Sequence, residues 1–333
     1  MGLLQYILTR IGAYLVILFV GITITFFLPR FMPSDPIEGY INQIQTQAGQ
    51  SMDPEAITKL RESLRKLYGL EGSLISQYFN YLKKVFIEFD FGPSLSGFPK
   101  PVTEFIMQAL PWTAGLLGVS ILFSWLIGNL IGLLAGFYHN TRWATALEVL
   151  GVTLYPIPYY ILALVLILLF AYVWPIFPLN TTIRPGPLSF EKIRMILYNS
   201  FLPALTLVLA GFGWNVLGMK ALSFANKEEG YVKFARLKGV PSRTIMTQYV
   251  ARNSFLPQIT ALALSIGGIF NGALLTEVLF SYPGLGLRMR TAIGNGDFNM
   301  LYGTVTISII AVATAALIID LLYPLFDPRI RYK

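Results

Sequence analysis

Six long stretches of the sequence are almost wholly apolar, and each is long enough to cross a lipid bilayer. A membrane-spanning helix needs about 20 mainly apolar residues. The six stretches run over residues 9–31, 109–137, 146–173, 201–222, 256–280 and 301–325. The pattern predicts an all-α polytopic membrane protein with six transmembrane helices. The first run, from Ile11 to Leu28, is itself long enough to span, and no small-residue cleavage site follows it, so we expect a retained helix rather than a signal peptide.

Prolines in the third and fourth of these stretches are expected to distort the helices. Pro156 and Pro158 lie in the third, and Pro203 lies in the fourth. Proline kinks or locally unwinds a helix, which a membrane tolerates where neighbouring helices satisfy the freed backbone groups. We therefore expect both stretches to remain spans with local distortions.

Between the first two spans the pattern changes to that of short amphipathic helices. Asp53-Pro54-Glu55 is a typical helix start, apolar residues recur at three- and four-residue spacing up to Leu67, and Gly69 is a plausible stop. A second such helix is expected from Ile75 to Phe89. The predicted organisation is residues 1–31 as N-terminus and first span, an external helical segment at 32–108, and a core membrane domain with the other five spans at 109–333. The external segment is either a cap packed on the outer ends of the spans or a docking surface for an external partner.

Composition agrees with a chain that is embedded in lipid. Apolar residues make up 55% of the chain, charged residues only 13%, and the mean hydropathy is +0.61. A soluble chain carries about a quarter charged residues. We explain the net charge of +8 by basic residues in the cytoplasmic loops of a membrane protein rather than by binding to nucleic acid.

The distribution of lysine and arginine predicts the orientation. With a cytoplasmic N-terminus, the inside segments hold twelve such residues and the two short outside loops, 174–200 and 281–300, hold five. The outside residues are Arg184, Lys192, Arg194, Arg288 and Arg290. Basic residues collect on the cytoplasmic face, so both termini are expected there.

The loop between the fourth and fifth spans, within residues 223–257, combines basic and apolar side chains. A short helix is expected to end at Gly239, because glycine adopts the positive φ of a helix C-cap, and Pro241 then starts the next helix. Two plain interpretations are a solvated basic segment and an amphipathic helix lying on anionic lipid head groups.

The same loop resembles the coupling loop, or EAA-type motif, of binding-protein-dependent ABC importers. Tyr231-Val232-Lys233, Ala235-Arg236 and Lys238-Gly239, followed by Arg252-Asn253 and Leu256-Pro257, resemble "YVRxARAKG" and "RNxxLP" of the oligopeptide/dipeptide/nickel permease family. Four further segments are similar to family motifs and occur in the family's order: 31–36, 90–94, 276–286 and 320–331. Ser34, Phe234 and Leu237 depart from the usual residues.

The resemblance implies a type I ABC-importer-like fold and the first-permease (B-type) subunit, in a prokaryotic plasma membrane. It implies as partners a second homologous permease, two ABC ATPase subunits and an external solute-binding protein. The cargo would be oligopeptides or oligosaccharides, moved by alternating access. The chain contains no Gly-x4-Gly-Lys-Ser/Thr loop, so ATP and Mg²⁺ would be bound by the partner subunits and no cofactor by this chain.

The resemblance also assigns roles within the loop. Tyr231, Phe234, Ala235 and Leu237 are expected to form an apolar plug in an ATPase groove. Its charged rim would be Arg236 and Lys238, with Lys233 in the same helix, and Gly239 would be the turn that lets the helix project.

Several residues near the spans are secondary candidates. Gly128, Gly132 and Gly136 form one small-residue face, and Gly268 and Gly272 form another. Such faces pack helices closely, and these would suit an interface with the second permease. Asp320 is expected to be a structural partner on the coupling-loop side. Glu277 either lines an entrance or stabilises the turn that contains Pro283, Gly284 and Gly286.

Two rival functions have less support. An ion-gradient-driven secondary transporter typically shows inverted repeats and carboxylates at the midplane of the membrane, and the sequence shows no convincing repeat and almost no midplane acid. A membrane-embedded enzyme needs a catalytic constellation, but the chain has no cysteine and a single histidine, His139.

Overall fold

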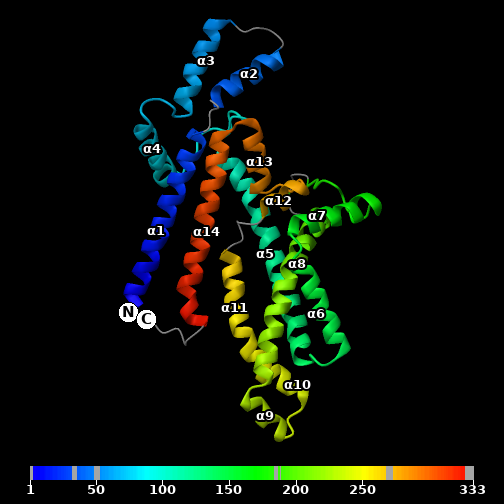
Figure 1. The fold of residues 1–333 in the computed structure, drawn as a ribbon. Helices are drawn as coiled ribbons and strands as arrows, with labels where there is room; N and C mark the ends of the chain where they lie inside the picture. Colours follow the sequence, from blue (N-terminus) through cyan, green and yellow to red (C-terminus); the bar gives the residue numbers. More distant parts are fainter. Residues whose placement is uncertain are drawn as a thin grey trace. The chain divides into compact units, whose positions relative to one another are not determined.

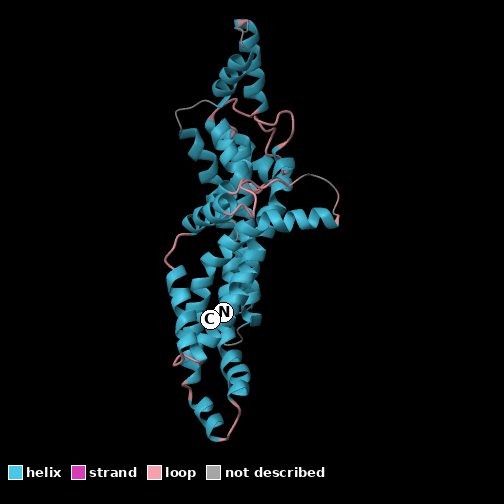
Figure 2. Ribbon diagram, turned by 90° about the vertical axis from the view of Figure 1, so that its right-hand side faces the viewer, coloured by secondary structure: helices cyan, strands magenta, loops and turns pink. Residues whose placement is uncertain are grey.

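The computed structural model describes residues 3–31, 36–48, 53–183, 187, 189–267 and 273–326. Their regular structure is helical throughout, apart from one isolated bridge between Pro93 and Pro101 (Figure 1, Figure 2). The all-α prediction is therefore confirmed for these residues. The helices are α1 (Leu3–Phe27), η1 (Leu28–Phe31), α2 (Pro36–Ala48), α3 (Pro54–Leu67), α4 (Leu74–Lys83), η2 (Lys84–Glu88), α5 (Val102–Phe137), α6 (Arg142–Leu154), α7 (Tyr159–Ile167), η3 (Leu168–Val173), α8 (Phe190–Lys227), α9 (Gly230–Leu237), α10 (Ser242–Thr244), η4 (Ile245–Ala251), α11 (Arg252–Gly267), α12 (Ala273–Leu279), α13 (Leu285–Asn295) and α14 (Phe298–Phe326).

Among the described residues, four helices are long and apolar enough to cross a membrane. They cover Leu4–Phe27, Val102–Phe137, Phe190–Lys227 and Phe298–Leu321. These are the first, second, fourth and sixth of the stretches expected from the sequence. Helix α8 continues on both sides of Pro203, so the expected distortion does not interrupt the helix there.

The third stretch is not one straight span. Helix α6 and the pair α7 and η3 meet at an angle of 100° across the break at residues 155–158. The cause is local, because Pro156 and Pro158 remove two amide donors within three residues and each disfavours a helical conformation in the residue before it. The local unwinding expected at these prolines is therefore present, and a crossing of the membrane by residues 146–173 as one broken span stays a prediction.

The fifth stretch is described only in part. Helices α11 and α12 fall within or beside 256–280, and the residues between them lie outside the described part of the chain. Gly268 and Gly272 are among those residues. Ser34 and residues 327–333 also lie outside the described part of the chain. A continuous fifth span stays a prediction.

The chain divides into two compact units, which we describe separately. Unit 1 comprises Met1–Ile11, Ala114–Tyr282 and Thr314–Lys333, and unit 2 comprises Gly12–Thr113 and Pro283–Ala313. In unit 1, α8 is the helix on which α6, α7 and α11 pack. One apolar cluster of this unit joins α7 to α8 through Ala163, Leu166 and Leu202.

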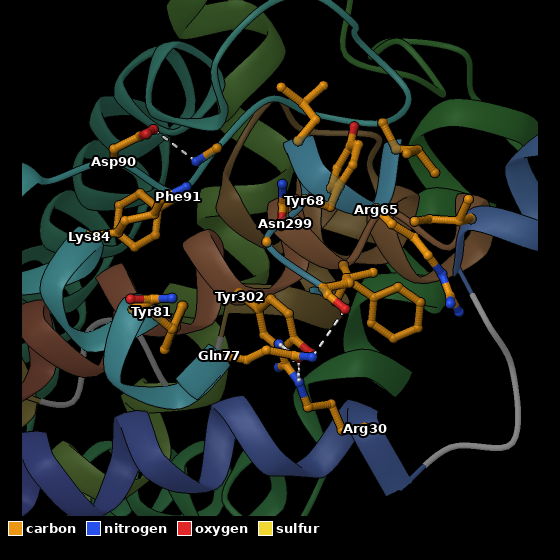
Figure 3. Close-up of a pocket in the computed structure, with 18 of the residues that line it drawn as sticks. Arg30, Arg65, Tyr68, Gln77, Tyr81, Lys84, Asp90, Phe91, Asn299 and Tyr302 are labelled. Carbon is orange, nitrogen blue, oxygen red and sulfur yellow. Dashed lines mark hydrogen bonds between the residues drawn. The ribbon is translucent and has the colours of Figure 1, made fainter. Parts of the chain in front are cut away.

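Unit 2 holds two helices that the hydropathy pattern did not predict. Helix α2 packs on α3 around a small core of Ile37, Ile41 and Leu64. Helix α13 occupies most of the segment expected to be an outside loop, 281–300. Elements of unit 2 surround a cavity of about 450 Å³ (Figure 3).

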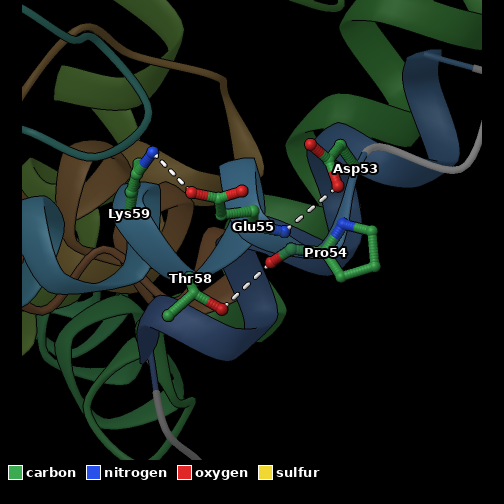
Figure 4. A network of polar contacts seen from close by, with 5 residues as sticks. All are labelled: Asp53, Pro54, Glu55, Thr58 and Lys59. Carbon is green, nitrogen blue, oxygen red and sulfur yellow. Dashed lines mark hydrogen bonds and ion pairs between the residues drawn. The ribbon is translucent and has the colours of Figure 1, made fainter.

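Helix α3 begins and ends where the sequence indicates. The Asp53 side chain accepts a hydrogen bond from the Glu55 amide at 3.3 Å, and Pro54 is the first helical residue (Figure 4). Thr58 donates to the Pro54 carbonyl, and Lys59 pairs with Glu55 at 2.9 Å. Gly69 follows the helix with φ of +65°, which a residue with a side chain rarely adopts.

A buried carboxylate fixes the start of α14 in unit 2. Asp297 is fully buried, and its Oδ2 accepts hydrogen bonds from the hydroxyls of Ser94 and Ser96, at 2.5 and 2.9 Å, and from the Ser96 amide. Its Oδ1 caps the helix by accepting from the Met300 amide at 3.1 Å. These charge-assisted bonds join the segment near residue 94 to α14.

Candidate functional site

The candidate site is the segment at residues 228–241, which we call the α9 segment. Helix α9 starts after Glu229. The backbone of Glu229 is extended (ψ 147°), and its side chain does not cap the helix. It ends at Gly239, which has φ of +76°. The Gly239 amide donates to the Arg236 carbonyl, and the Val240 amide donates to the Ala235 carbonyl at 3.1 Å. The structure therefore has the short helix and the glycine turn that the sequence predicted.

One face of α9 is buried in unit 1. Val232 and Ala235 are 0% and 4% exposed, and they sit three residues apart, so they lie on the same side of the helix. They belong to an apolar cluster whose other members come from α5, α8 and η4: Leu133, Phe137, Met219, Ile245, Val250 and Ala251. This cluster anchors α9 to the ends of the long helices.

The other side of α9 carries apolar side chains that reach solvent. Tyr231, Phe234 and Leu237 are 40%, 58% and 86% exposed. The ammonium group of Lys238 lies 4.6 Å from the centre of the Phe234 ring, a cation–π contact. Arg236 is exposed as well. Large exposed apolar groups with charged neighbours are typical of an interaction surface.

The expected apolar plug needs one correction. Ala235 was expected in the plug with Tyr231, Phe234 and Leu237, but it is packed inside the chain's own core. The reason is helical geometry, because residue 235 shares the face of Val232 rather than that of Phe234. Val232, which was not assigned a role, is the residue that anchors the helix with it.

Neighbouring elements hold the start of α9 in place. The Tyr231 and Tyr249 rings stack with their centres 6.5 Å apart, and the Asn253 amide donates to the Tyr231 hydroxyl at 2.9 Å. Lys233 pairs with Glu228 at 3.6 Å on the surface, an interaction worth about 0–1 kcal/mol. Neither Tyr249 nor Asn253 was identified as a site residue from the sequence, although Asn253 lies in the quoted "RNxxLP" segment.

The glycine face of α5 packs within this chain. A Cβ at Gly128, Gly132 or Gly136 would lie 2.5 Å from an atom of α8, respectively the Asn215 Cβ, the Val216 carbonyl oxygen and the Lys220 carbonyl oxygen. The backbones of α5 and α8 therefore meet more closely than any side chain would allow. The close helix packing expected of these glycines is therefore confirmed, but their partner is α8 of the same chain rather than a second permease.

Asp320 pairs with the N-terminal helix rather than with the coupling loop. Its Oδ2 lies 3.0 Å from Nη1 of Arg10, and its backbone oxygen accepts from the Tyr6 hydroxyl at 2.7 Å. These contacts join the N-terminal part of α1 to α14 within unit 1. These contacts agree with the structural role expected for Asp320, for which the sequence indicated no particular partner residue.

Glu277 and the turn residues fall in different units. In unit 1 the Glu277 side chain is fully buried, and its backbone carbonyl accepts from the Tyr282 amide at 2.7 Å, whereas a role at the turn or at an entrance stays a prediction. In unit 2, Pro283 and Gly284 precede α13, which includes Gly286, and the Leu285 amide donates to the Thr113 hydroxyl at 2.8 Å. Among the described residues, no group of three or more His, Cys, Asp or Glu side chains could hold a metal ion.

Comparison with known proteins assigns the chain to a family. Residues 128–332 match the family described as "Binding-protein-dependent transport system inner membrane component", and residues 3–116 match the corresponding N-terminal family. The chain is 26% identical to the oligopeptide transport system permease protein OppB of Salmonella typhimurium, over 99% of this chain and all of that protein.

Two further relatives align over nearly their whole length. The inner membrane ABC transporter permease protein YejB of Escherichia coli O157:H7 is 28% identical over 98% of this chain and 99% of that protein. The dipeptide transport system permease protein DppB of Bacillus subtilis is 28% identical over 98% of both. The family match covers the α9 segment and most of unit 1. This multi-pass plasma-membrane protein belongs to the binding-protein-dependent transport system inner membrane components, the permease subunits of ABC importers.

Proposed function

We propose that the chain is the first permease subunit of an ABC importer that moves peptides into the cytoplasm. An external solute-binding protein would deliver the cargo, and a second permease would complete the pathway through the membrane. Two partner ATPases would bind and hydrolyse ATP, which this chain would not do. Six spans with both termini in the cytoplasm would place the α9 segment on the ATPase side.

The observation that carries the proposal is the division of α9 into two faces. Val232 and Ala235 fix the helix to α5, α8 and η4, while Phe234 and Leu237 point away from that core into solvent. A helix that is held on one side and apolar on the other can transmit a displacement. Burying Phe234 and Leu237 in a partner's groove would contribute about 1.5–3 kcal/mol each, before the costs of association.

The mechanism is alternating access. Closure of the ATPase pair would displace α9, and the anchoring cluster would pass that movement to α8 and to η4, which leads into α11. A partner shifts a conformational equilibrium only by the difference between its affinities for the two states. The groove must therefore bind Phe234 and Leu237 with a different affinity when ATP is bound. Arg236 and Lys238 would form a charged rim around these side chains.

Peptides are the proposed cargo because relatives of full length are named as oligopeptide and dipeptide permeases. Oligosaccharides, the other cargo considered, have no comparable observation in their favour. Uptake of labelled peptides and of labelled oligosaccharides by vesicles that contain the whole transporter would decide between them. Uptake that requires ATP and persists with an uncoupler would exclude an ion-gradient-driven transporter.

The coupling role is tested by Phe234→Asp in the reconstituted transporter. A carboxylate in place of the ring should reduce cargo-stimulated ATP hydrolysis about tenfold or more, since a buried unpaired charge costs several kcal/mol. The matched control is Phe190→Asp, because Phe190 is 82% exposed at the other end of α8. Unchanged coupling in Phe234→Asp, with normal assembly, would refute the assignment.

A further inference from the structure

The cavity in unit 2 has a chemistry that the import mechanism does not use. It measures about 450 Å³, a size typical of small-molecule sites. Its charged lining residues are three cations, Arg30, Arg65 and Lys84, and one carboxylate, Asp90. Figure 3 shows the three cations coming from different sides: Arg30 follows α1, Arg65 belongs to α3 and Lys84 begins η2. Arg65 also has an interaction within the chain, so the cations of the cavity without an ion pair among the described residues are Arg30 and Lys84.

Arg30 shows the excess of positive charge most clearly. Its guanidinium donates to the Phe26 carbonyl and the Tyr302 hydroxyl, each at 3.0 Å, and to the side-chain oxygen of Gln77 at 3.4 Å. It also lies 3.5 Å from the centre of the Phe26 ring. All these partners are neutral, and none of the described carboxylates lies within ion-pair distance of Arg30.

A partly buried cation surrounded by neutral partners is costly. Burial lowers the pKa of the Arg30 guanidinium from its ordinary value. Buried charges in proteins are normally paired, because removing an ion from water costs several kcal/mol that only an opposite charge and hydrogen bonds offset. Asp90 does not play this part, since its Oδ1 accepts from the Gly92 amide at 2.8 Å. An anion from outside the chain would supply the missing charge.

The cavity lies level with the ends of two candidate spans. The apolar span of α1 ends at Phe27, three residues before Arg30, and that of α14 begins at Phe298, which itself lines the cavity. Arginine and tyrosine at the ends of spans lie at the level of the lipid head groups. Three leucines, Leu67, Leu70 and Leu74, also line the cavity and offer apolar surface beside the cations.

We propose that this cavity binds the phosphodiester head group of an anionic phospholipid. Arg65 and Lys84 would contact the phosphate together with the fixed guanidinium of Arg30, and the leucines would contact the start of the acyl chains. Guanidinium groups suit this role because they bind phosphate oxygens through two parallel hydrogen bonds. The inference depends on the membrane location of the chain and not on its coupling to ATPases.

The experiment compares two double variants of the full transporter, purified in detergent and examined by native mass spectrometry. The first is Arg65→Gln with Lys84→Gln. The second, a matched control, is Lys66→Gln with Lys83→Gln, which removes the same charge from the adjacent positions that do not line the cavity. Arg30 is left intact because its replacement would also break contacts to Gln77 and Tyr302.

The wild type should retain phosphatidylglycerol in preference to phosphatidylcholine. The cavity variant should retain about thirtyfold less phosphatidylglycerol, since it lacks two of the basic groups that would bind the anionic head group. The control variant should behave as the wild type. Equal losses in both variants, or none in the cavity variant, would overturn the proposal. Displacement of the lipid by millimolar inorganic phosphate would show that the cavity binds free phosphate, and it would overturn the proposal of a lipid ligand.

Discussion

Helices α3 and α9 are short, amphipathic and outside the candidate spans, yet they present different surfaces. Each packs one side on its own unit: α3 buries Leu64 against α2, and α9 buries Val232 and Ala235 against α5, α8 and η4. On α3 the opposite side is charged and includes the Lys59–Glu55 pair, in which both side chains are 74% exposed. On α9 the opposite side carries Phe234 and Leu237.

The difference indicates that the exposed side of α3 needs no partner protein to cover it, whereas the exposed side of α9 does. The exposed charges of α3 are satisfied by water and by each other, and their ion pair contributes about 0.2–1 kcal/mol at most. The exposed apolar groups of α9 gain nothing from water and would gain from a partner. Of the two roles considered for the external segment, the charged surface of α3 favours a cap over a docking surface.

The largest effect should come from placing a charge on the buried face of each helix. Val232→Asp should release α9, because an unpaired carboxylate in the anchoring cluster costs about 3 kcal/mol or more. Cargo-stimulated ATP hydrolysis should be lost, and hydrogen exchange at residues 230–240 should rise. Leu64→Asp is the counterpart on α3 and should raise exchange at residues 54–67 while coupling persists. Loss of coupling in both variants would mean that α3 also belongs to the coupling path.

The next effect concerns the exposed faces. Leu237→Lys should lower cargo-stimulated ATP hydrolysis about tenfold, since an ammonium group would have to be desolvated in the partner's groove. The side chain is 86% exposed, so the free energy of unfolding should change by no more than about 0.5 kcal/mol. Lys59→Glu on α3 should leave both quantities unchanged. Thermal unfolding followed by tryptophan fluorescence, together with ATPase assays, measures the two effects, and a coupling defect in Lys59→Glu would contradict the contrast.

A smaller effect should come from the glycines that end the two helices. Gly239 and Gly69 have φ of +76° and +65°, and each has open space where a Cβ would lie. Alanine at either position should therefore cost about 1 kcal/mol through backbone strain alone. Only Gly239→Ala should also reduce coupling, by a few-fold, because it changes how α9 projects. Equal transport by both variants would show that the turn has no role beyond stability.

The sequence predicted best those features that depend on neighbouring residues. The start of α3 at Asp53 and Pro54, and the ends of α3 and α9 at Gly69 and Gly239, follow from cap and turn chemistry within a few residues. Hydropathy located the four long spans for the same reason, since each is a continuous apolar run. The α9 helix was predicted from the turn at Gly239 and Pro241, and only its coupling role came from the resemblance to a family motif.

Features that depend on distant partners were predicted wrongly or not at all. The burial of Ala235 depends on residues of α5 and η4, and the pairing of Asp320 depends on Arg10, more than 300 residues away in sequence. The Asp297 cap joins residues separated by about 200 positions. By contrast, the break at residues 155–158 has a local cause, and the two prolines indicated it, although the sequence does not distinguish a kink from a bend of 100°.

The smallest effect should appear at the helix starts, where the two helices also differ. Asp53 caps α3 through the Glu55 amide, whereas Glu229 precedes α9 in a suitable extended conformation without a side-chain cap. Asp53→Ala should cost α3 about 1 kcal/mol. Glu229→Asp keeps the charge but shortens the side chain enough to accept from the first-turn amides, so it should stabilise α9 by up to about 1 kcal/mol. Hydrogen exchange of the first-turn amides measures both, and slower exchange in α9 with unchanged ATPase coupling is the expected result. Faster exchange in Glu229→Asp would show that Glu229 already stabilises the helix by another contact.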